Sequence, residues 1–164
     1  MKMAIQQFCT HAMVSKYEKL FYEPAAERLE SLTSDNSKEA VVLSTQYKRL
    51  LELWGDIKIE SPVRETNGTY RVGDSFSVTA TARLGQLRPD EVSIELYYGP
   101  MKAVDMISES HFKEMTVKEE KGNGTYLYMC TITCNVSGRY GFTVRAVPRG
   151  DDRIKFAPGC ITWA

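Results

Sequence analysis

Cysteine thiols are the first candidates for chemistry in this 164-residue chain, because thiolates form disulfides and bind zinc. Cys130 and Cys134 both lie in residues 125–134, which alternate between apolar and polar side chains like a β-strand. On a strand their Cα atoms would be about 13 Å apart, well beyond the roughly 7 Å limit of a disulfide. Their spacing also lacks the tight CxxC form of zinc sites. We therefore expect Cys130, Cys134, Cys9 and Cys160 to be unpaired thiols in a reducing cytoplasm.

Metal binding and acid–base catalysis have little local support either. The two histidines, His11 and His111, lie far apart in the sequence, on a predicted helix and in a predicted loop. Neighbouring acids such as Glu119 and Glu120 would point to opposite faces of a strand, unlike two carboxylates that converge on a glycosidic bond. The sequence contains no glycine-rich phosphate loop and no GxSxG nucleophile elbow. We therefore predict no catalytic residue, no cofactor-binding residue and no metal site in this chain.

The composition excludes two classes of partner. Lysine plus arginine and aspartate plus glutamate both total 21, so the formal net charge is zero and no long-range field attracts nucleic acid or an anionic membrane. Apolar runs fall far short of the ~20 residues that cross a bilayer. The first residues show no secretory signal pattern. We therefore expect a cytoplasmic protein that binds neither nucleic acid nor membrane.

Helical periodicity dominates the first 55 residues. Pro24 suits the first turn of a second short helix, and the polar residues 33–37 then break it. Asn36 and Glu39 resemble a capping box that opens a third helix, which ends at Gly55. The apolar stripe of the first helix consists of Ile5, Phe8, Cys9, Met13, Tyr17, Leu20 and Phe21.

After Gly55 the period of the apolar residues changes to two, which is typical of β-strands. The predicted strands lie at residues 57–60, 76–84, 92–98, 115–120, 126–132, 140–146 and 160–163. Turn signals such as Asn123-Gly124 separate them. The predicted fold class is therefore α+β in sequence order. A helical segment, residues 1–55, precedes an all-β immunoglobulin-like antiparallel sandwich of about seven strands, residues 56–164, whose outer faces should be mainly polar.

The helical segment carries more large apolar side chains than it can bury alone. Each contributes roughly 1.5–3 kcal/mol when fully buried, and exposing several would create an unusually large apolar patch. We therefore expect the helices either to fold onto the sandwich or to pair with a second copy of the chain, and we favour pairing, which gives a homodimer. The side chains concerned are Met13, Tyr17, Phe21, Leu43, Tyr47, Leu50 and Trp54.

Two stretches are distinctive beyond their periodicity. The first, FCTHAMVSKY at residues 8–17 followed by FYEPA at residues 21–25, resembles the last helix of the catalytic region in bacterial-type α-glucan (glycogen or maltodextrin) phosphorylases. The second stretch is similar to the C-terminal extension of the same enzymes. It comprises LRPDEV at 87–92, ELYYGP at 95–100, SGRYGFTVR at 137–145, PRGDD at 148–152 and PGCITWA at 158–164.

This resemblance implies a parent enzyme that cleaves the end of an α-1,4-glucan with inorganic phosphate and releases glucose 1-phosphate. It also implies pyridoxal phosphate held as a Schiff base on a lysine that precedes Met1. Residues 1–55 would then be the end of the catalytic second lobe, and residues 56–164 a C-terminal domain. The chain would be a noncatalytic fragment, inactive alone, whose partner is the remainder of the phosphorylase chain.

Two other functions remain open at this stage. The sandwich could be a carbohydrate-binding module that contacts α-glucan through Tyr97 or Tyr98, the only contiguous aromatic pair outside the helices. Because strand residues alternate, only one of the two can face a ligand while the other enters the core. A row of exposed aromatic side chains on one sheet would favour this function. A stand-alone hydrolase would instead need acids that converge in a deep cleft.

Overall fold

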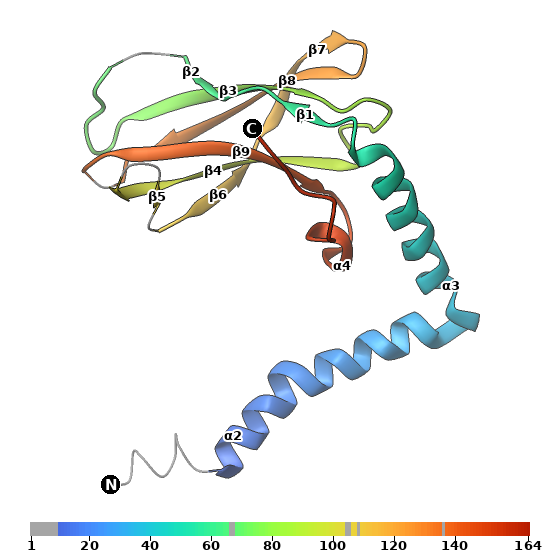
Figure 1. The fold of residues 1–164 in the computed structure, drawn as a ribbon. Coiled ribbons are helices and arrows are strands. Elements are labelled where there is room, and N and C mark those ends of the chain that lie inside the picture. The colour runs from blue at the N-terminus through green and yellow to red at the C-terminus, as the bar shows by residue number, and fades with distance from the viewer. Residues whose placement is uncertain (1–9, 66–67, 104–105, 108, 136) are drawn as a thin grey trace, which may run out of the picture. The chain divides into compact units, whose positions relative to one another are not determined.

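A computed structural model describes residues 10–65, 68–103, 106–107, 109–135 and 137–164. The chain divides into two compact units, Met1–Gln46 and Tyr47–Ala164. Long helices precede two antiparallel sheets in the chain (Figure 1). The predicted fold class, a helical segment followed by an antiparallel sandwich, is therefore confirmed.

The described part of the first unit is helical except for one kink. It contains α2 (Thr10–Tyr17), the π-helical segment η1 (Glu18–Tyr22) and the beginning of α3 (Glu23–Trp54). Pro24 lies in the first turn of α3, as expected, but the chain reaches it without leaving the helical conformation. The backbone N–H of Glu23 donates to the carbonyl of Glu18, which is the wider π pattern. Pro24 has no N–H to donate, and the wider turn accommodates this loss.

A kink interrupts α3 where the polar residues 33–37 predict a break. Ser34 has ψ 160°, and the next three residues, Asp35, Asn36 and Ser37, have φ values of 49°, 55° and 59°. Asn36 is therefore left-handed, whereas the N-cap of a capping box is extended, so the predicted capping geometry is wrong. Instead, the hydroxyl of Ser31 donates to the carboxylate of Glu39 across the kink.

The described residues of the first unit bury none of their side chains. Met13, Tyr17, Leu20, Phe21 and Leu29 are all exposed large apolar residues. The predicted stripe residues Ile5, Phe8 and Cys9 lie outside the described residues. Considered alone, the first unit is therefore a helical element without a core of its own.

The first sheet of the second unit is built around the long antiparallel pair of β3 and β8, which are not consecutive in the chain. It contains β1 (Lys58–Ile59), β2 (Val63–Arg64), β3 (Ser75–Arg83), β7 (Thr116–Gly122) and β8 (Thr125–Thr133). Their order is β1-β3-β8-β7, and β2 also pairs with β3. Asn123 and Gly124, at φ 54° and 68°, form the tight turn between β7 and β8 that their sequence predicts.

The second sheet contains β4 (Val92–Ala103), β5 (Met106–Ile107), β6 (His111–Glu114), β9 (Tyr140–Pro148) and β10 (Thr162–Trp163). Their order is β10-β9-β4-β5, and β6 also pairs with β4. A short helix, α4 (Asp152–Lys155), lies between β9 and β10 in the chain. All seven predicted strands are present. The short strands β2, β5 and β6 are additional, so His111 lies on a strand and not in the predicted loop.

The core of the second unit lies between the sheets and includes the end of α3. Strand alternation directs Val78, Ala80 and Ala82 inward from one sheet and Ile94 and Leu96 inward from the other, and all five are buried.

The last two turns of α3 close this core. Leu50 and Trp54 are buried, and the Trp54 indole N–H donates to the Thr162 hydroxyl at 3.1 Å. The Tyr47 hydroxyl donates to the carbonyl of Pro158 at 3.1 Å. For Tyr47, Leu50 and Trp54 the favoured pairing with a second copy is therefore wrong, because these side chains fold onto their own sandwich.

None of the described helices combines the length and apolar character that crossing a membrane would require. The described cysteines, Cys130, Cys134 and Cys160, are free thiols. Burial raises the pKa of the Cys130 thiol, an effect that Lys113 opposes, and burial alone raises that of Cys160. Both thiols are therefore poor nucleophiles near neutral pH. Cys9 lies outside the described residues.

Candidate functional site

The outer face of the second sheet brings chemically distinctive side chains together. Since Ile94 and Leu96 point into the core, Glu95 and Tyr97 of β4 point outward. Directly opposite residues of neighbouring strands share a face. The register places Arg145 opposite Glu95, Trp163 opposite Arg145, and Phe112 opposite Tyr97. Four strands thus contribute to one outward-facing group.

A buried carboxylate lies at the centre of this group. The Glu95 side chain is only 2% exposed. Its Oε2 accepts from Arg145 Nε at 2.9 Å and lies 2.8 Å from Arg145 Nη2, while its Oε1 lies 3.1 Å from Lys155 Nζ. Charge-assisted pairing of this kind offsets the cost of removing a carboxylate from water. Together, the carboxylate of Glu95 and the two cations Arg145 and Lys155 carry a net charge of +1.

Four aromatic rings surround the two cations. The Arg145 guanidinium carbon is 5.4–5.9 Å from the ring centroids of Tyr97, Phe112, Phe156 and Trp163. Lys155 Nζ is 5.5 Å and 5.7 Å from the rings of Phe112 and Phe156. These distances lie within the range of cation–π attraction. We call these four aromatic residues, with Arg145 and Lys155, the aromatic–cation surface.

Helix α4 supplies the part of this surface that no strand provides. Asp151 caps the helix, because its Oδ1 accepts from the backbone N–H of Arg153 at 2.8 Å. The same carboxylate also accepts from the Arg153 side chain at 2.8 Å. The fixed helix start places Lys155 at the helix end and Phe156 directly after it, where both reach Arg145 or its partner Glu95.

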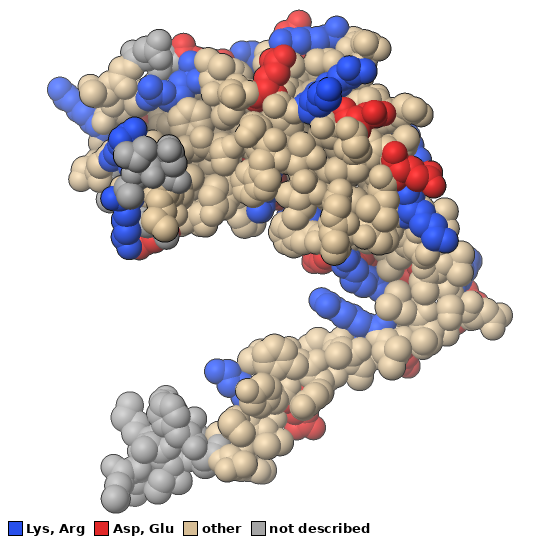
Figure 2. All heavy atoms as spheres, in the orientation of Figure 1, with Lys and Arg blue, Asp and Glu red and all other residues tan. Residues whose placement is uncertain are grey.

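Three of the four rings are open to solvent, although the cations between them are largely covered. Phe112, Phe156 and Trp163 are 59%, 55% and 47% exposed, whereas the Arg145 side chain is 14% exposed. In the space-filling view, the visible charged side chains of the sandwich lie mostly along its upper edge and at its two ends (Figure 2). The sequence predicts mainly polar outer faces; on this sheet Glu95, Arg145 and Thr143 fit that prediction, but exposed aromatic residues lie among them.

The predicted site residues Tyr97 and Tyr98 lie on opposite faces of β4. Tyr97 belongs to the aromatic–cation surface, and its ring meets Trp163 edge-on at 5.5 Å. Tyr98 packs against the core from a partly buried position, with its ring 5.9 Å from that of His111. The prediction that one tyrosine enters the core is therefore confirmed, whereas contact of either tyrosine with glucan stays a prediction.

Sequence reasoning missed most of this surface. Phe112, Phe156 and Trp163 are isolated aromatic residues in the sequence, so no contiguous motif marks them. Alternation along residues 140–146 and 160–163 could have assigned Arg145 and Trp163 to outward faces. It could not have shown that these faces adjoin, because that depends on strand order.

Within the described part of the chain, no group of three or more His, Cys, Asp or Glu side chains could hold a metal ion. The two histidines lie on different elements, His11 on α2 and His111 on β6. What the aromatic–cation surface offers is thus stacking on aromatic faces and donation of hydrogen bonds from two cations, and not metal chemistry.

Comparison with known proteins gives consistent results. A family model described as the glycogen phosphorylase C-terminal domain matches residues 54–164. Glycogen phosphorylases of Mycobacterium tuberculosis (strain CDC 1551 / Oshkosh) and Mycobacterium bovis are 30% and 29% identical over 139 residues, covering 84% of this chain and 16% of each relative. The maltodextrin phosphorylase of Thermococcus litoralis is 25% identical over 163 residues, covering 96% of this chain and 18% of the relative. No solved structure gives a significant match.

The chain thus spans less than a fifth of the length of these curated relatives. The matched residues 54–164 contain both sheets, α4 and the whole aromatic–cation surface. They make up more than half of the chain, and the resemblance of the sequence to α-glucan phosphorylases is confirmed. The chain belongs to the glycogen phosphorylase C-terminal domain family.

Proposed function

We propose that this chain is the noncatalytic C-terminal part of an α-glucan phosphorylase, a glycosyltransferase. The parent enzyme cleaves the end of an α-1,4-glucan with inorganic phosphate and releases glucose 1-phosphate. The observation that carries the proposal is the family match over residues 54–164. The small share of each relative that the chain covers, 16–18%, supports a contribution to a larger enzyme.

Pyridoxal phosphate is the cofactor that the resemblance implies for the parent, and the described residues of this chain do not fit it. Among the described lysines only Lys155 is not exposed. Its ammonium group lies 3.1 Å from the buried carboxylate of Glu95 and close to two phenylalanine rings. A Schiff base requires a free amine, and this group is held in an ion pair. We therefore assign the cofactor lysine to another part of the parent.

A carbohydrate-binding sandwich is the second candidate function. It is favoured by the exposed aromatic residues Phe112, Phe156 and Trp163 on one face of the second sheet, with Tyr97 beside them. Aromatic faces with a few convergent polar groups are typical of ligand sites. No comparable observation favours a stand-alone hydrolase.

Self-association through the helical unit is part of the same proposal. The described residues of the first unit bury no side chain, and Met13, Tyr17, Leu20 and Phe21 expose about half of their surface or more. Exposed apolar side chains that lie together on one helix often mark a contact surface. For the isolated chain we propose a homodimer in which this face meets a second copy, and we propose a cytoplasmic location.

The test compares two purified proteins: the isolated chain, and the polypeptide encoded when the reading frame is followed upstream of Met1. The longer polypeptide should form glucose 1-phosphate from glucan and inorganic phosphate. The isolated chain should form none above a control without protein, with or without added pyridoxal phosphate. Phosphate-dependent product from the isolated chain, or none from the longer polypeptide, would contradict the proposal.

A further inference from the structure

The aromatic–cation surface has the composition of a binding site and remains open in this chain. Its exposed large side chains, Phe112, Phe156 and Trp163, are all aromatic. Trp163 on β10 and Phe112 on β6 are separated by β9 and β4, and both rings lean toward Arg145, whose guanidinium carbon is 5.5 Å and 5.7 Å from their centroids. The surface therefore presents several rings around one cation, which suits a ligand with more than one sugar ring.

Hydrogen-bond donors lie between the rings and are partly accessible, since the side chains of Arg145 and Lys155 are 14% and 28% exposed. Arg145 uses Nε and Nη2 toward Glu95, and its Nη1 makes no hydrogen bond to the other described residues. Lys155 has three N–H donors and directs one of them to Glu95. Both cations are fixed by the same buried carboxylate, so these donors are held in place before any ligand arrives.

This chemistry fits a neutral saccharide. The C–H groups of a pyranose ring carry partial positive charge and stack on the negative face of an aromatic ring. Sugar hydroxyls accept hydrogen bonds from Arg145 and Lys155 without needing a formal charge. A protein that covered the aromatic–cation surface would remove its net charge of +1 from water. That desolvation costs free energy unless the covering protein supplies a carboxylate. A hydrated saccharide leaves that charge in contact with water.

We infer that the aromatic–cation surface binds an α-1,4-linked glucan chain, with sugar rings stacked on Trp163 and Phe112 and hydroxyls bound by Arg145 and Lys155. The choice of glucan rests on the proposed function; the choice of a saccharide rests on the surface itself. Tyr97 orients the site, because its ring packs edge-on against Trp163 at 5.5 Å and faces Phe112 across the strands.

The experiment titrates maltoheptaose into the purified chain by calorimetry and follows tryptophan fluorescence. Trp163 is half-exposed whereas Trp54 is buried, so a ligand at this surface should change the emission of Trp163. Trp163→Ala and Phe112→Ala should each weaken binding about tenfold or more, equivalent to about 1.4 kcal/mol. Phe21→Ala is the matched control, because Phe21 is 58% exposed and Phe112 59%, and it should leave the affinity unchanged.

Circular dichroism establishes that each variant is folded, and the two site variants lie on different strands, so the test does not depend on one substitution. Absence of maltoheptaose binding, or binding that neither site variant weakens, would overturn the inference. Cellohexaose, with β-1,4 links, should bind more weakly; equal binding would overturn the assignment to an α-linked chain.

Failure of this inference and failure of the proposed function give different results. An active longer polypeptide whose C-terminal chain does not bind maltoheptaose would refute only the inference. A chain that binds maltoheptaose, within a longer polypeptide that forms no glucose 1-phosphate, would refute only the proposed function. If Trp163→Ala made the longer polypeptide insoluble but left maltoheptaose affinity of the isolated chain unchanged, the surface would be a protein contact and the inference would be overturned.

Discussion

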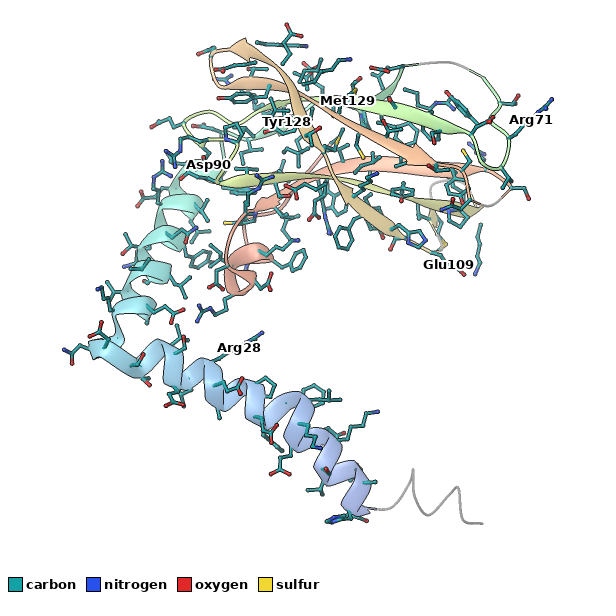
Figure 3. The ribbon with its side chains drawn as sticks, turned by 180° about the vertical axis from the view of Figure 1, so that it is seen from behind. Arg28, Arg71, Asp90, Glu109, Tyr128 and Met129 are labelled. Carbon is teal, nitrogen blue, oxygen red and sulfur yellow. The ribbon has the colours of Figure 1, made fainter. Side chains whose placement is uncertain are left out.

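Replacing Tyr128 with Phe should stabilise the sandwich, which is unusual for a core substitution. Tyr128 lies on β8 (Figure 3), and the strand register places it directly opposite Ala80 and Val117 of the flanking strands. Its side chain is almost completely buried, and its hydroxyl has no hydrogen-bond partner among the residues that the structure describes. A buried polar group without a partner costs roughly 1–3 kcal/mol, and phenylalanine keeps the ring while removing that group. We expect a gain of about 1 kcal/mol in the free energy of unfolding at pH 7.

The difference between Tyr128→Phe and the unchanged chain should grow at alkaline pH. Burial, with a smaller effect from Tyr126, raises the pKa of Tyr128 to about 12, whereas an unfolded tyrosine titrates near its usual value of 10. Below pH 10 the Tyr128 hydroxyl keeps its proton in both the folded and the unfolded state, so its titration takes nothing from the free energy of unfolding. Between pH 10 and pH 12 the unfolded state loses the proton first, so stability falls. At pH 11 the loss through this group is about 1.4 kcal/mol, and the Phe variant escapes it.

Urea denaturation at pH 7 and pH 11, followed by circular dichroism, measures both effects. Tyr22→Phe is the control, because Tyr22 is exposed on the helical unit and its hydroxyl should not affect unfolding of the sandwich. If Tyr128→Phe were less stable than the unchanged chain at pH 7, the hydroxyl would have a hydrogen-bond partner and the reasoning would be refuted. Equal loss of stability in both proteins between pH 7 and pH 11 would refute the part that concerns the pKa.

Three further predictions concern other parts of the chain. Glu95→Gln leaves two largely covered cations without their carboxylate, so it should lower the free energy of unfolding, measured by urea denaturation, by about 3–5 kcal/mol. The control Glu114→Gln, on an exposed ion pair, should lower it by less than about 1 kcal/mol. Equal losses in the two variants would contradict the role of Glu95. Thiol titration under denaturing, nonreducing conditions should find four thiols, and in the native chain Cys130 and Cys160 should react slowest; a count of two would indicate a disulfide. Light scattering over a dilution series should find a dimer that Phe21→Glu weakens, because Phe21 is exposed on the helical unit; a monomer at every concentration would contradict the proposed pairing.

Periodicity identified the strands of this chain because a buried face repeats every second residue. All seven predicted strands exist, whereas β2, β5 and β6 span only two to four residues and are too short to show alternation. Those short strands exist because they pair with β3 and β4, a contact between segments that a local pattern does not contain. The break in α3 was predictable for the opposite reason, since polar residues that favour turns mark it locally.

Periodicity identifies an apolar face but not what covers it. Tyr47, Leu50 and Trp54 lie on the apolar stripe of the predicted third helix, as Phe21 lies on that of the first, and the sequence gives no reason to treat the two stripes differently. In the structure the last two turns of α3 belong to the sandwich, where Leu50 and Trp54 are buried, while Phe21 stays exposed. The family model begins at residue 54, close to this change in packing.

The candidate site was harder to predict for a related reason. Strand alternation assigns Glu95 to an outward face, and outward charged residues are mostly solvated. Its burial results from Arg145, which lies 50 residues away in the sequence, and from Lys155 on α4. Only the order of the strands and the short helix bring these residues together, so no spacing within the sequence could reveal a buried ion cluster.

The two outer faces of the sandwich differ in a way that bears on function. On the first sheet, serine and threonine hydroxyls pair across the strands, as between Ser75 and Thr133 at 2.9 Å and between Ser77 and Thr131 at 3.0 Å. Its edge strand β7 is exposed at every residue and carries several charges, which discourages pairing with other strands. This sheet therefore has the features of a surface that remains in water.

On the second sheet the corresponding positions hold aromatic rings around fixed cations, and exposed rings are not needed to stabilise a sandwich whose core already lies between the sheets. Phe112 and Trp163 expose about half of their surface, so they gain only part of the roughly 1.5–3 kcal/mol that full burial would provide. The outer face of the first sheet also carries apolar residues, because Val63, Leu127 and Met129 share it with the serines and threonines. What distinguishes the second sheet is that exposed aromatic rings surround two cations there. These rings gain little from their own fold, and a ligand that completes their burial is the physical reason to test the second sheet for glucan binding.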